Sequence, residues 1–172
     1  RSTVGTATEV YDYLRLLYAR LGTPHCPSCR RTITQQTPER IATTLMESHQ
    51  GQRSLVLAPI VHERKGEYRQ ELTELQQQGY VRVRIDGAVR RLDEEIVLGR
   101  YERHTIEVVV DRLEVRPSNR PRLLEAIERA LGIADGRVSF LIGTDRHELH
   151  GTERACPDCG IAIPEIEPNL FS

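Results

Sequence analysis

All four cysteines of the chain occur in two Cys-Pro-x-Cys motifs, one near each end of the sequence. The first motif contains Cys26 and Cys29, and the second contains Cys156 and Cys159. The two-residue spacing lets both thiolates of a motif bind one tetrahedral zinc ion from a tight turn. Four sulfur ligands complete a structural site and leave no position for a substrate or a reactive water. The sequence therefore predicts a structural zinc, although each pair could instead complete its shell with ligands outside this chain.

The two motifs are far apart, with 126 residues between Cys29 and Cys156. The corresponding gap in a compact zinc ribbon is roughly 15–20 residues, so this gap is long enough to hold a domain. We therefore expect the two chain ends, residues 1–33 and 152–172, to form a zinc-stapled helical base. Residues 34–151 are expected to form a domain inserted into that base.

Other chemistries are weaker interpretations of the same residues. A thioredoxin-like redox site places its cysteine pair at the start of a helix that follows a strand, whereas Cys26 follows a predicted helix. Acidic residues such as Glu107 and Asp111 are usually solvated when they lie on an exposed strand face. The chain contains no Gly-x-Ser-x-Gly, phosphate-binding glycine loop or His-Glu-x-x-His motif. We therefore predict no catalytic site and no enzyme activity for this chain.

The composition is that of a soluble globular protein with little net charge. Hydrophobic residues make up 38% and charged residues 28%, and 24 basic residues nearly balance 25 acidic ones at a formal net charge of −1. This balance argues against a polycation built to bind nucleic acid. No apolar run reaches the roughly 20 residues of a membrane span. We expect no membrane span and no secretory leader, and because the sequence starts at Arg1 we expect a piece of a longer, cytoplasmic protein.

Helical periodicity predicts one helix in the base and three in the insert. A capping box formed by Thr6 and Glu9 opens the base helix, which we expect over about residues 7–21. The first helix of the insert is predicted to begin at Thr37-Pro38. The second carries Tyr68, Leu72 and Leu75 and ends before Gly79, and the third runs from Pro121 to Gly132.

Runs of apolar and alternating residues predict the strands of a small sheet. Residues 104–115 form the longest such run and should be a central strand, with Glu107 and Asp111 on one face. Pro59, which has no N–H, places the strand over residues 54–61 at a sheet edge or at the end of the strand. The other expected segments are strands at 80–86, 88–92 and 137–142, a turn at Asp86-Gly87, and a return loop at 144–154. The fold is therefore predicted to be α+β, with a small mixed sheet and about three helices.

Arginines on the predicted sheet suggest a face that is not covered by helices. Arg82 and Arg84 project from the same side of one strand, and Arg112 ends the central strand. Such residues suit bidentate contacts with carboxylates on another protein. They could equally form a solvated charged face, or contact DNA phosphates together with Arg30 and Arg31. Their spacing does not choose among these interpretations.

Seven segments, in this order along the chain, match one protein family: residues 1–20, 57–60, 64–66, 78–87, 104–112, 155–160 and 167–172. This set closely resembles UvrA, the family of damage-sensing ATPase subunits of the bacterial excinuclease. Because the segments span nearly the whole chain, the resemblance is specific.

The resemblance implies that the chain ends belong to the first ATP-binding half of UvrA, joined through the zinc module, and that the insert binds UvrB. It also implies that Arg82 and Arg112 contact UvrB. We add Arg84, which projects beside Arg82, and Lys65, in a matching segment, as candidate partner-binding residues. Many relatives have His at the position of Cys29, and His is a zinc ligand that cannot form a disulfide.

The resemblance also implies what this chain lacks. The phosphate-binding loop, the signature motif and the magnesium-site strand of the family lie outside these residues, so ATP binding belongs to the parent protein only. The parent is expected to be a homodimer that acts on damaged DNA. We predict that this chain is a protein-interaction module of nucleotide excision repair that docks UvrB through a charged face and helps to load it at lesions. The alternative is a zinc-dependent module that binds the backbone of duplex DNA.

Overall fold

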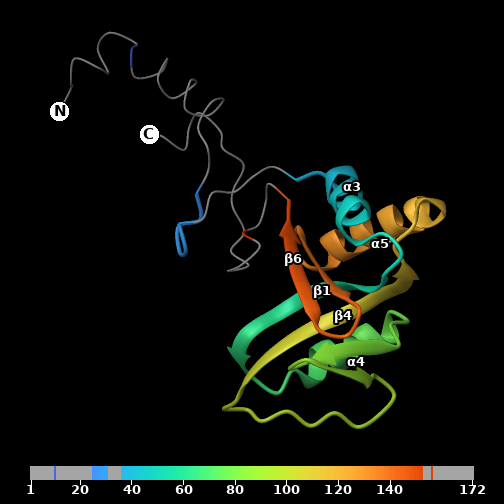
Figure 1. Ribbon diagram of the computed structural model, residues 1–172. Coiled ribbons are helices and arrows are strands. Elements are labelled where there is room, and N and C mark those ends of the chain that lie inside the picture. Colours follow the sequence, from blue (N-terminus) through green and yellow to red (C-terminus); the bar gives the residue numbers. More distant parts are fainter. Residues whose placement is uncertain (1–9, 11–24, 31–35, 153–155, 157–172) are drawn as a thin grey trace.

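The computed structural model describes residue 10 and residues 25–30, 36–152 and 156. Its body is a six-stranded sheet in which all neighbouring strands are antiparallel (Figure 1). The strand order is β3-β2-β4-β1-β5-β6. The strands are β1 (Arg53–Lys65), β2 (Arg82–Ile85), β3 (Ala88–Arg91), β4 (Arg103–Glu114), β5 (Arg137–Ile142) and β6 (Arg146–Gly151).

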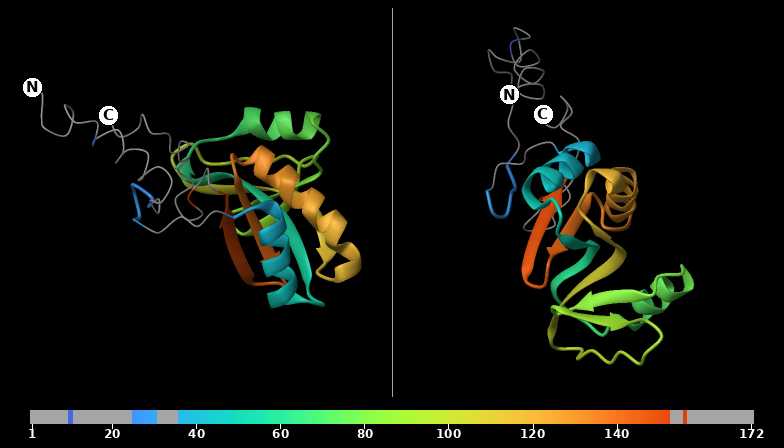
Figure 2. Two further views of the ribbon diagram at one scale, coloured as in Figure 1. Left: turned by 90° about the horizontal axis from the view of Figure 1, so that it is seen from above. Right: turned by 45° about the vertical axis from the view of Figure 1, so that its right-hand side comes forward.

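Within residues 36–152 the helices are α3 (Pro38–His49), α4 (Arg69–Gln77) and α5 (Arg120–Ile133), with a 3-10 turn, η1 (Pro117–Asn119), before α5. The helix α4 connects β1 to β2 and α5 connects β4 to β5, and each connection passes over one intervening strand. Right-handed crossovers place both helices on one face of the sheet. The right-hand view of Figure 2 shows them on the same side, and α3 packs against α5.

This order of elements is a split βαβ arrangement of the ferredoxin type, with β3 and β6 added at the two edges of the sheet. The predicted α+β class with three helices in the insert is confirmed. The sheet is antiparallel rather than mixed in strand direction. In the part of the chain that the structure describes, no helix combines the length and the apolar character needed to cross a membrane.

The main hydrophobic core lies between the sheet and its helices, and its fully buried side chains include Phe140 and Ile106. Successive side chains of a strand point to opposite faces of the sheet. Leu57, Glu107 and Ser139 are also buried, but they lie outside the core cluster, on the face opposite the helices. We call this second face the open face.

Local sequence signals account for several element boundaries. The hydroxyl of Thr37 accepts a hydrogen bond from the N–H of Arg40 at 3.2 Å and so caps α3. Asp86 and Gly87 have φ values of 49° and 89°, as a type I′ turn requires, and they connect β2 to β3. The strand β4 pairs with β2 on one side and with β1 on the other, so the predicted central position of residues 104–115 is confirmed.

The predicted strand end at Pro59 is wrong, because β1 continues to Lys65, but the predicted sheet edge is present locally, because at Pro59 β1 pairs with β4 alone. The strand β5 pairs only with residues 54–57 of β1. A register irregularity with β4 follows directly after Pro59. The proline is therefore tolerated inside a central strand because it lies beyond the end of the pairing with β5.

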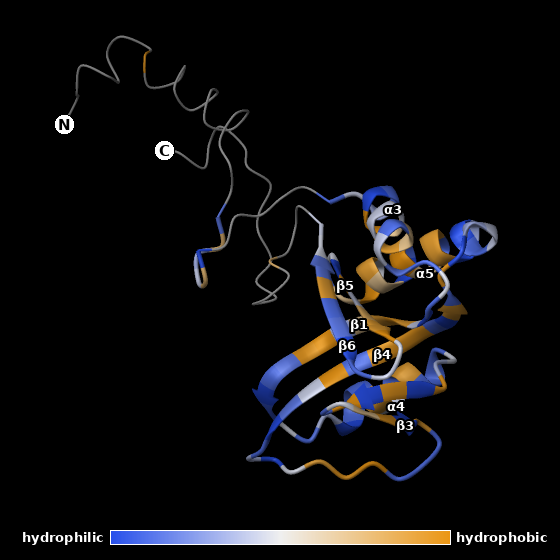
Figure 3. Cartoon of the chain, in the orientation of Figure 1, coloured by the Kyte–Doolittle hydropathy of each residue, from blue (hydrophilic) through white to orange (hydrophobic). Residues whose placement is uncertain are grey.

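The return loop predicted over residues 144–154 is also wrong, because residues 146–151 form β6, which pairs with β5 along its whole length. Figure 3 shows that β6 is mostly hydrophilic, so no apolar alternation reveals it in the sequence. Its polar side chains have partners on both faces of the sheet. His147 contacts Glu107 on the open face, and Glu148 lies 2.7 Å from His49 of α3.

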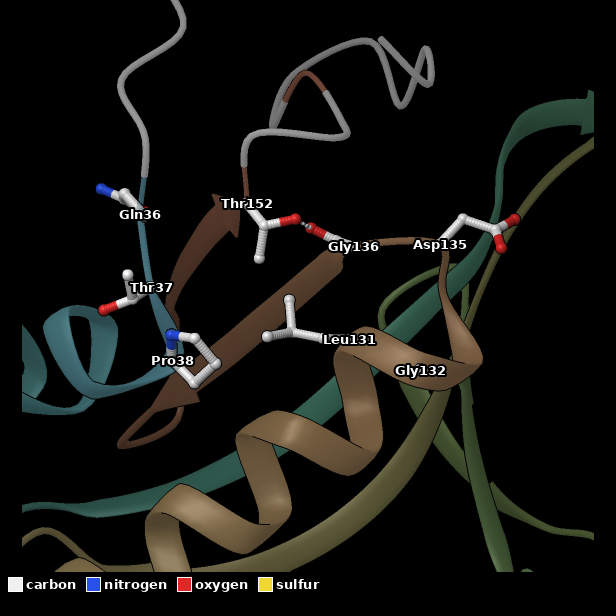
Figure 4. A pocket seen from close by; sticks show the side chains of 8 residues that line it. All are labelled: Gln36, Thr37, Pro38, Leu131, Gly132, Asp135, Gly136 and Thr152. Atoms are coloured by element: carbon white, nitrogen blue, oxygen red, sulfur yellow. Dashed lines mark hydrogen bonds between the residues drawn. The ribbon is translucent and has the colours of Figure 1, made fainter. Parts of the chain in front are cut away.

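The chain enters and leaves the domain at neighbouring positions. Figure 4 shows Gln36 and Thr152 beside the C-terminal end of α5, around a cavity of about 610 Å³. The N–H of Thr152 donates a hydrogen bond to the carbonyl of Gly136 at 2.8 Å, which fixes the exit from the sheet. Neighbouring ends are the geometry that a domain insertion requires.

Two expectations for the base stay predictions. The helix expected over residues 7–21 lies outside the described residues, apart from Val10. The division into a base and an insert at residues 33/34 and 151/152 likewise concerns segments that the structure describes only in part.

Candidate partner-binding face and metal cluster

Three of the four cysteines come together from opposite ends of the chain. The Sγ atoms of Cys26, Cys29 and Cys156 all lie within 4.8 Å of one another, and those of Cys29 and Cys156 are 3.6 Å apart. Two sulfurs bound to one tetrahedral zinc at about 2.3 Å are separated by about 3.8 Å. The cluster could therefore hold a metal ion. Cys159, the fourth predicted ligand, lies outside the described residues.

The first cysteine motif forms a tight turn that favours the thiolate. The N–H of Arg30 donates a hydrogen bond to the carbonyl of Cys26 at 2.9 Å. A backbone hydrogen bond from Cys29 is the largest cause that lowers the pKa of the Cys26 thiol to about 7, while burial acts in the opposite direction. Because the thiolate is the form that binds metal, this turn is suited to a ligand pair.

A buried carboxylate lies at the centre of the open face. Glu107 of β4 is 1% exposed and accepts hydrogen bonds from three other strands. The donors are Arg84 Nη1 of β2 at 2.6 Å, Ser139 Oγ of β5 at 2.5 Å and His147 Nε2 of β6 at 2.8 Å. Because β1 lies between β4 and β5, two of these contacts cross it. The carboxylate therefore connects the two halves of the sheet on this face.

These hydrogen bonds keep Glu107 ionised. Burial is the largest single influence and raises the pKa of Glu107, but the hydrogen bonds from His147, Ser139 and Arg84 together outweigh it, so the pKa lies below its ordinary value. Glu107 is therefore a buried, paired carboxylate. The expectation of a solvated acid at this position is wrong, because Glu107 is buried. The sequence did not reveal this because the three donors come from other strands.

Three arginines border a concavity on the open face where β2, β4 and β1 are neighbours. Its volume is about 510 Å³. The lining consists of Arg53, Ser54, Leu55, Arg82, Val89, Val109, Arg112, Gly143 and Thr144. We call it the arginine cavity. The structure thus brings together Arg82 and Arg112, two of the four predicted partner-binding residues.

The arginine cavity is positively charged, and the nearby carboxylate of Asp111 lies in a neighbouring hollow that Arg82 and Arg112 also line. The lining of the arginine cavity contains no acidic residue, and the ion pairs of the described residues include neither Arg53, Arg82 nor Arg112. Some arginines elsewhere are paired, as Arg91 is with Asp93 at 2.6 Å, and others, such as Arg40 and Arg90, have no ion pair among the described residues. What distinguishes the cavity is that it brings three arginines together. Unpaired guanidinium groups beside an apolar floor suit a ligand that presents carboxylates or phosphates.

The register between β1 and β4 contains a β-bulge near this cavity. Asp111 pairs with Val56, but the next residue of β1, Leu57, pairs with Val109. The strand β4 therefore has one extra residue at Val110. A bulge of this kind reverses the alternation of side chains for the residues that follow it.

The bulge explains why Arg112 lies on the open face. Strict alternation from Glu107 would place Asp111 on the open face and Arg112 on the helix face. Instead Arg112 lines the same cavity as Val109, and Asp111 binds Arg122 of α5. The prediction that Asp111 shares a face with Glu107 is wrong for this reason.

The other two predicted partner-binding residues lie apart from the cavity lining. Arg84 is on the open face, but its guanidinium is engaged by Glu107 and is 17% exposed. In the register of β1 with β4, Lys65 lies opposite Arg103 at one end of β1, whereas Arg53 lies opposite Glu114 at the other end, beside the cavity. A role for Arg84 and Lys65 in partner binding stays a prediction.

Arg53 is a cavity residue that sequence reasoning missed. It precedes the apolar run of β1, so it resembles an ordinary polar residue at a strand start. The signal that could have placed Arg53 on the same face as Leu55 is their two-residue spacing, since side chains two apart in a strand share a face. Leu55 lies on the cavity floor, which places Arg53 at its border.

Comparisons with known proteins show the family to which the chain belongs. A model of the UvrA interaction domain family matches residues 36–143. Relatives named UvrABC system protein A from Clostridium acetobutylicum and Bacillus subtilis are each 46% identical to the chain, and that from Mycobacterium tuberculosis is 48% identical. In each case the similarity covers 100% of this chain and 18% of the relative. The chain thus spans less than a fifth of the length of these relatives, and it belongs to the UvrA interaction domain family.

Proposed function

We propose that this chain is the module through which a UvrA protein binds UvrB during nucleotide excision repair, with the arginine cavity as the docking site. The observation that carries this proposal is the convergence of Arg53, Arg82 and Arg112, all without intramolecular ion pairs among the described residues, on one concave surface. Family membership supports UvrB as the partner and a cytoplasmic setting. The ATPase activity and the dimerisation of a UvrA protein reside in the parent, of which this chain is a part.

The cavity is better matched to a protein than to duplex DNA. Its floor is formed by the apolar side chains of Leu55, Val89 and Val109, which gain stability when another apolar surface covers them. Arginine is enriched at the energetically dominant positions of protein interfaces, and apolar surface beside it excludes water from its contacts. UvrB is therefore expected to place carboxylates against the guanidinium groups and apolar side chains against the floor.

The proposal is tested by isothermal titration calorimetry of the chain with UvrB. Saturable binding with one UvrB per chain, weakened by added salt, supports it. The rival function is tested by fluorescence anisotropy with damaged and undamaged duplex at two salt concentrations. Tight and steeply salt-dependent binding to DNA in the absence of UvrB binding would replace the proposal by the DNA-binding alternative.

Arg53→Ala is expected to weaken UvrB binding by about 1 kcal/mol, or roughly fivefold in Kd, because Arg53 lies at the border of the cavity. Arg40→Ala is the matched control, since Arg40 is an exposed arginine on α3 that does not line the cavity. Calorimetry of both variants measures the effect. Equal affinity for the two variants would remove Arg53 from the docking site.

We further propose that Cys26, Cys29, Cys156 and Cys159 hold one structural zinc ion, which joins a base made of residues 1–33 and 152–172. The three described thiols support this proposal by their mutual proximity. Four thiolates around zinc complete a tetrahedral site, so the bound ion would supply cross-linking rather than catalysis. The inserted domain, residues 34–151, would then have a fixed point of attachment.

Elemental analysis of the chain is expected to give one zinc per molecule. Cys156→Ala should lose its zinc to a competing chelator at least tenfold faster than the wild type, because the shell retains only three sulfurs. Ser28→Ala, which changes the turn of the first cysteine motif without removing a ligand, should retain zinc as the wild type does. One zinc per molecule retained equally by all three proteins would exclude Cys156 as a ligand.

A further inference from the structure

Arg122 of α5 contacts β4 at its bulge, directly beside the arginine cavity. Its Nε lies 2.8 Å from Asp111 Oδ2 and its Nη2 lies 2.7 Å from Asp111 Oδ1, which is a bidentate pair. The same Nη2 lies 3.4 Å from the carbonyl oxygen of Arg112. A helix on one face of the sheet is thus connected to the strand residue whose side chain lies on the other face.

Asp111 completes the contact from the strand side. Its Oδ1 accepts a hydrogen bond from the N–H of Arg112 at 2.7 Å. The peptide groups on both sides of the Arg112 Cα atom are therefore held, one through Asp111 and one through Arg122. The strand β2 pairs with β4 only at residues 106–108, so no neighbouring strand on that side fixes the bulge. The pKa of Asp111 lies below its ordinary value, chiefly because of the hydrogen bond from Arg122.

We infer that Arg122 is a positioning residue for docking, which acts through Asp111 and the bulge to direct the side chain of Arg112 into the arginine cavity. This inference rests on the proposed function, in which Arg112 contacts UvrB. The guanidinium of Arg122 is paired with Asp111, but Arg122 also lines a second hollow together with Arg82 and Arg112, so a direct contact with the partner is the alternative that the experiment distinguishes. Without the contacts from Arg122, the side chain of Arg112 would be free to adopt other orientations. Ordering it when UvrB binds would then cost conformational entropy and weaken the affinity.

Arg122→Lys is the most informative substitution, because lysine keeps the positive charge but cannot form a bidentate pair with Asp111. We expect the Kd for UvrB to rise about tenfold, within the range for residues that share one network. In an Arg112→Ala background the same substitution should have no further effect. Arg69→Lys is the control, since Arg69 lies on α4, pairs with Glu67 at 3.7 Å and does not line the arginine cavity.

Amide hydrogen exchange followed by NMR provides a readout that does not depend on the partner. In Arg122→Lys the N–H of Arg112 should exchange several times faster than in the wild type, and in Arg69→Lys it should be unchanged. A wild-type chain that does not bind UvrB would overturn the proposed function, together with the docking role of Arg122. Wild-type binding with unchanged affinity in Arg122→Lys would overturn the positioning role alone. If Arg122→Lys lowers the affinity for UvrB equally in the wild-type and the Arg112→Ala backgrounds, Arg122 contacts UvrB directly, and this result also overturns the positioning role.

Discussion

Glu107→Gln is expected to lower the free energy of unfolding of this chain by about 3 kcal/mol, the range observed when one member of a buried ion pair is removed. The carboxylate is 1% exposed and accepts hydrogen bonds from Arg84, Ser139 and His147. Glutamine has the same shape but carries no charge and offers only one acceptor oxygen. Arg84, at 17% exposure, would lose its counter-charge while still partly buried.

Urea denaturation of the two proteins at pH 7 measures this difference. Asp93→Asn is the control, because Asp93 forms a bidentate pair with Arg91 in which both side chains are about half exposed. Exposed pairs of this kind contribute little to stability, so the control should unfold close to the wild type. A Glu107→Gln protein as stable as the control would show that the central carboxylate is not needed to hold the sheet.

The pH dependence of the same experiment follows from the lowered pKa of Glu107. A carboxyl group with a lower pKa in the folded state contributes stability that is present above its unfolded pKa of about 4.3. This contribution is lost as the pH falls through the folded value. The difference between the wild type and Glu107→Gln should therefore narrow as the pH is lowered from about 5. A difference that stays constant to pH 3 would contradict the assignment of an ionised Glu107.

Features encoded over a few neighbouring residues could be predicted from the sequence. The cap at Thr37, the turn at Asp86-Gly87 and the apolar run of β4 each depend on local geometry, and each is confirmed. The cysteine motifs likewise predicted a cluster of ligands, because thiol spacing alone indicates a metal turn. The resemblance, rather than strand spacing, assigned Arg82 and Arg112 a common role, and the structure places both in the lining of the arginine cavity.

Features that depend on distant contacts could not be predicted. The strand β6 is held by polar contacts such as that of His147 with Glu107, so it has no apolar pattern. The bulge at Val110 follows from the pairing of β4 with β1, which no property of β4 alone reveals. Because one extra residue reverses the faces that follow, this single irregularity decides which side of the sheet carries Arg112.

Replacing both Arg82 and Arg112 by Ala should have the largest effect on partner binding. If each is a buried contact in the complex, each costs about 2 kcal/mol or more. Both line the arginine cavity, and neither has an ion pair within the described residues, so their removal breaks no intramolecular salt bridge there. The double variant should therefore keep the stability of the wild type while its Kd for UvrB rises about a thousandfold.

The matched control for this double variant is Arg40→Ala with Arg90→Ala, which removes the same charge from exposed arginines outside the cavity. Stopped-flow association and dissociation rates should distinguish a loss of long-range attraction from a loss of docked contacts. Loss of long-range attraction alone would reduce the association rate equally in both and leave dissociation unchanged. Loss of docked contacts should speed dissociation only in the variant lacking Arg82 and Arg112. Equal affinities of the two double variants for UvrB would mean that the cavity is not the docking site, because only one of them removes its guanidinium groups.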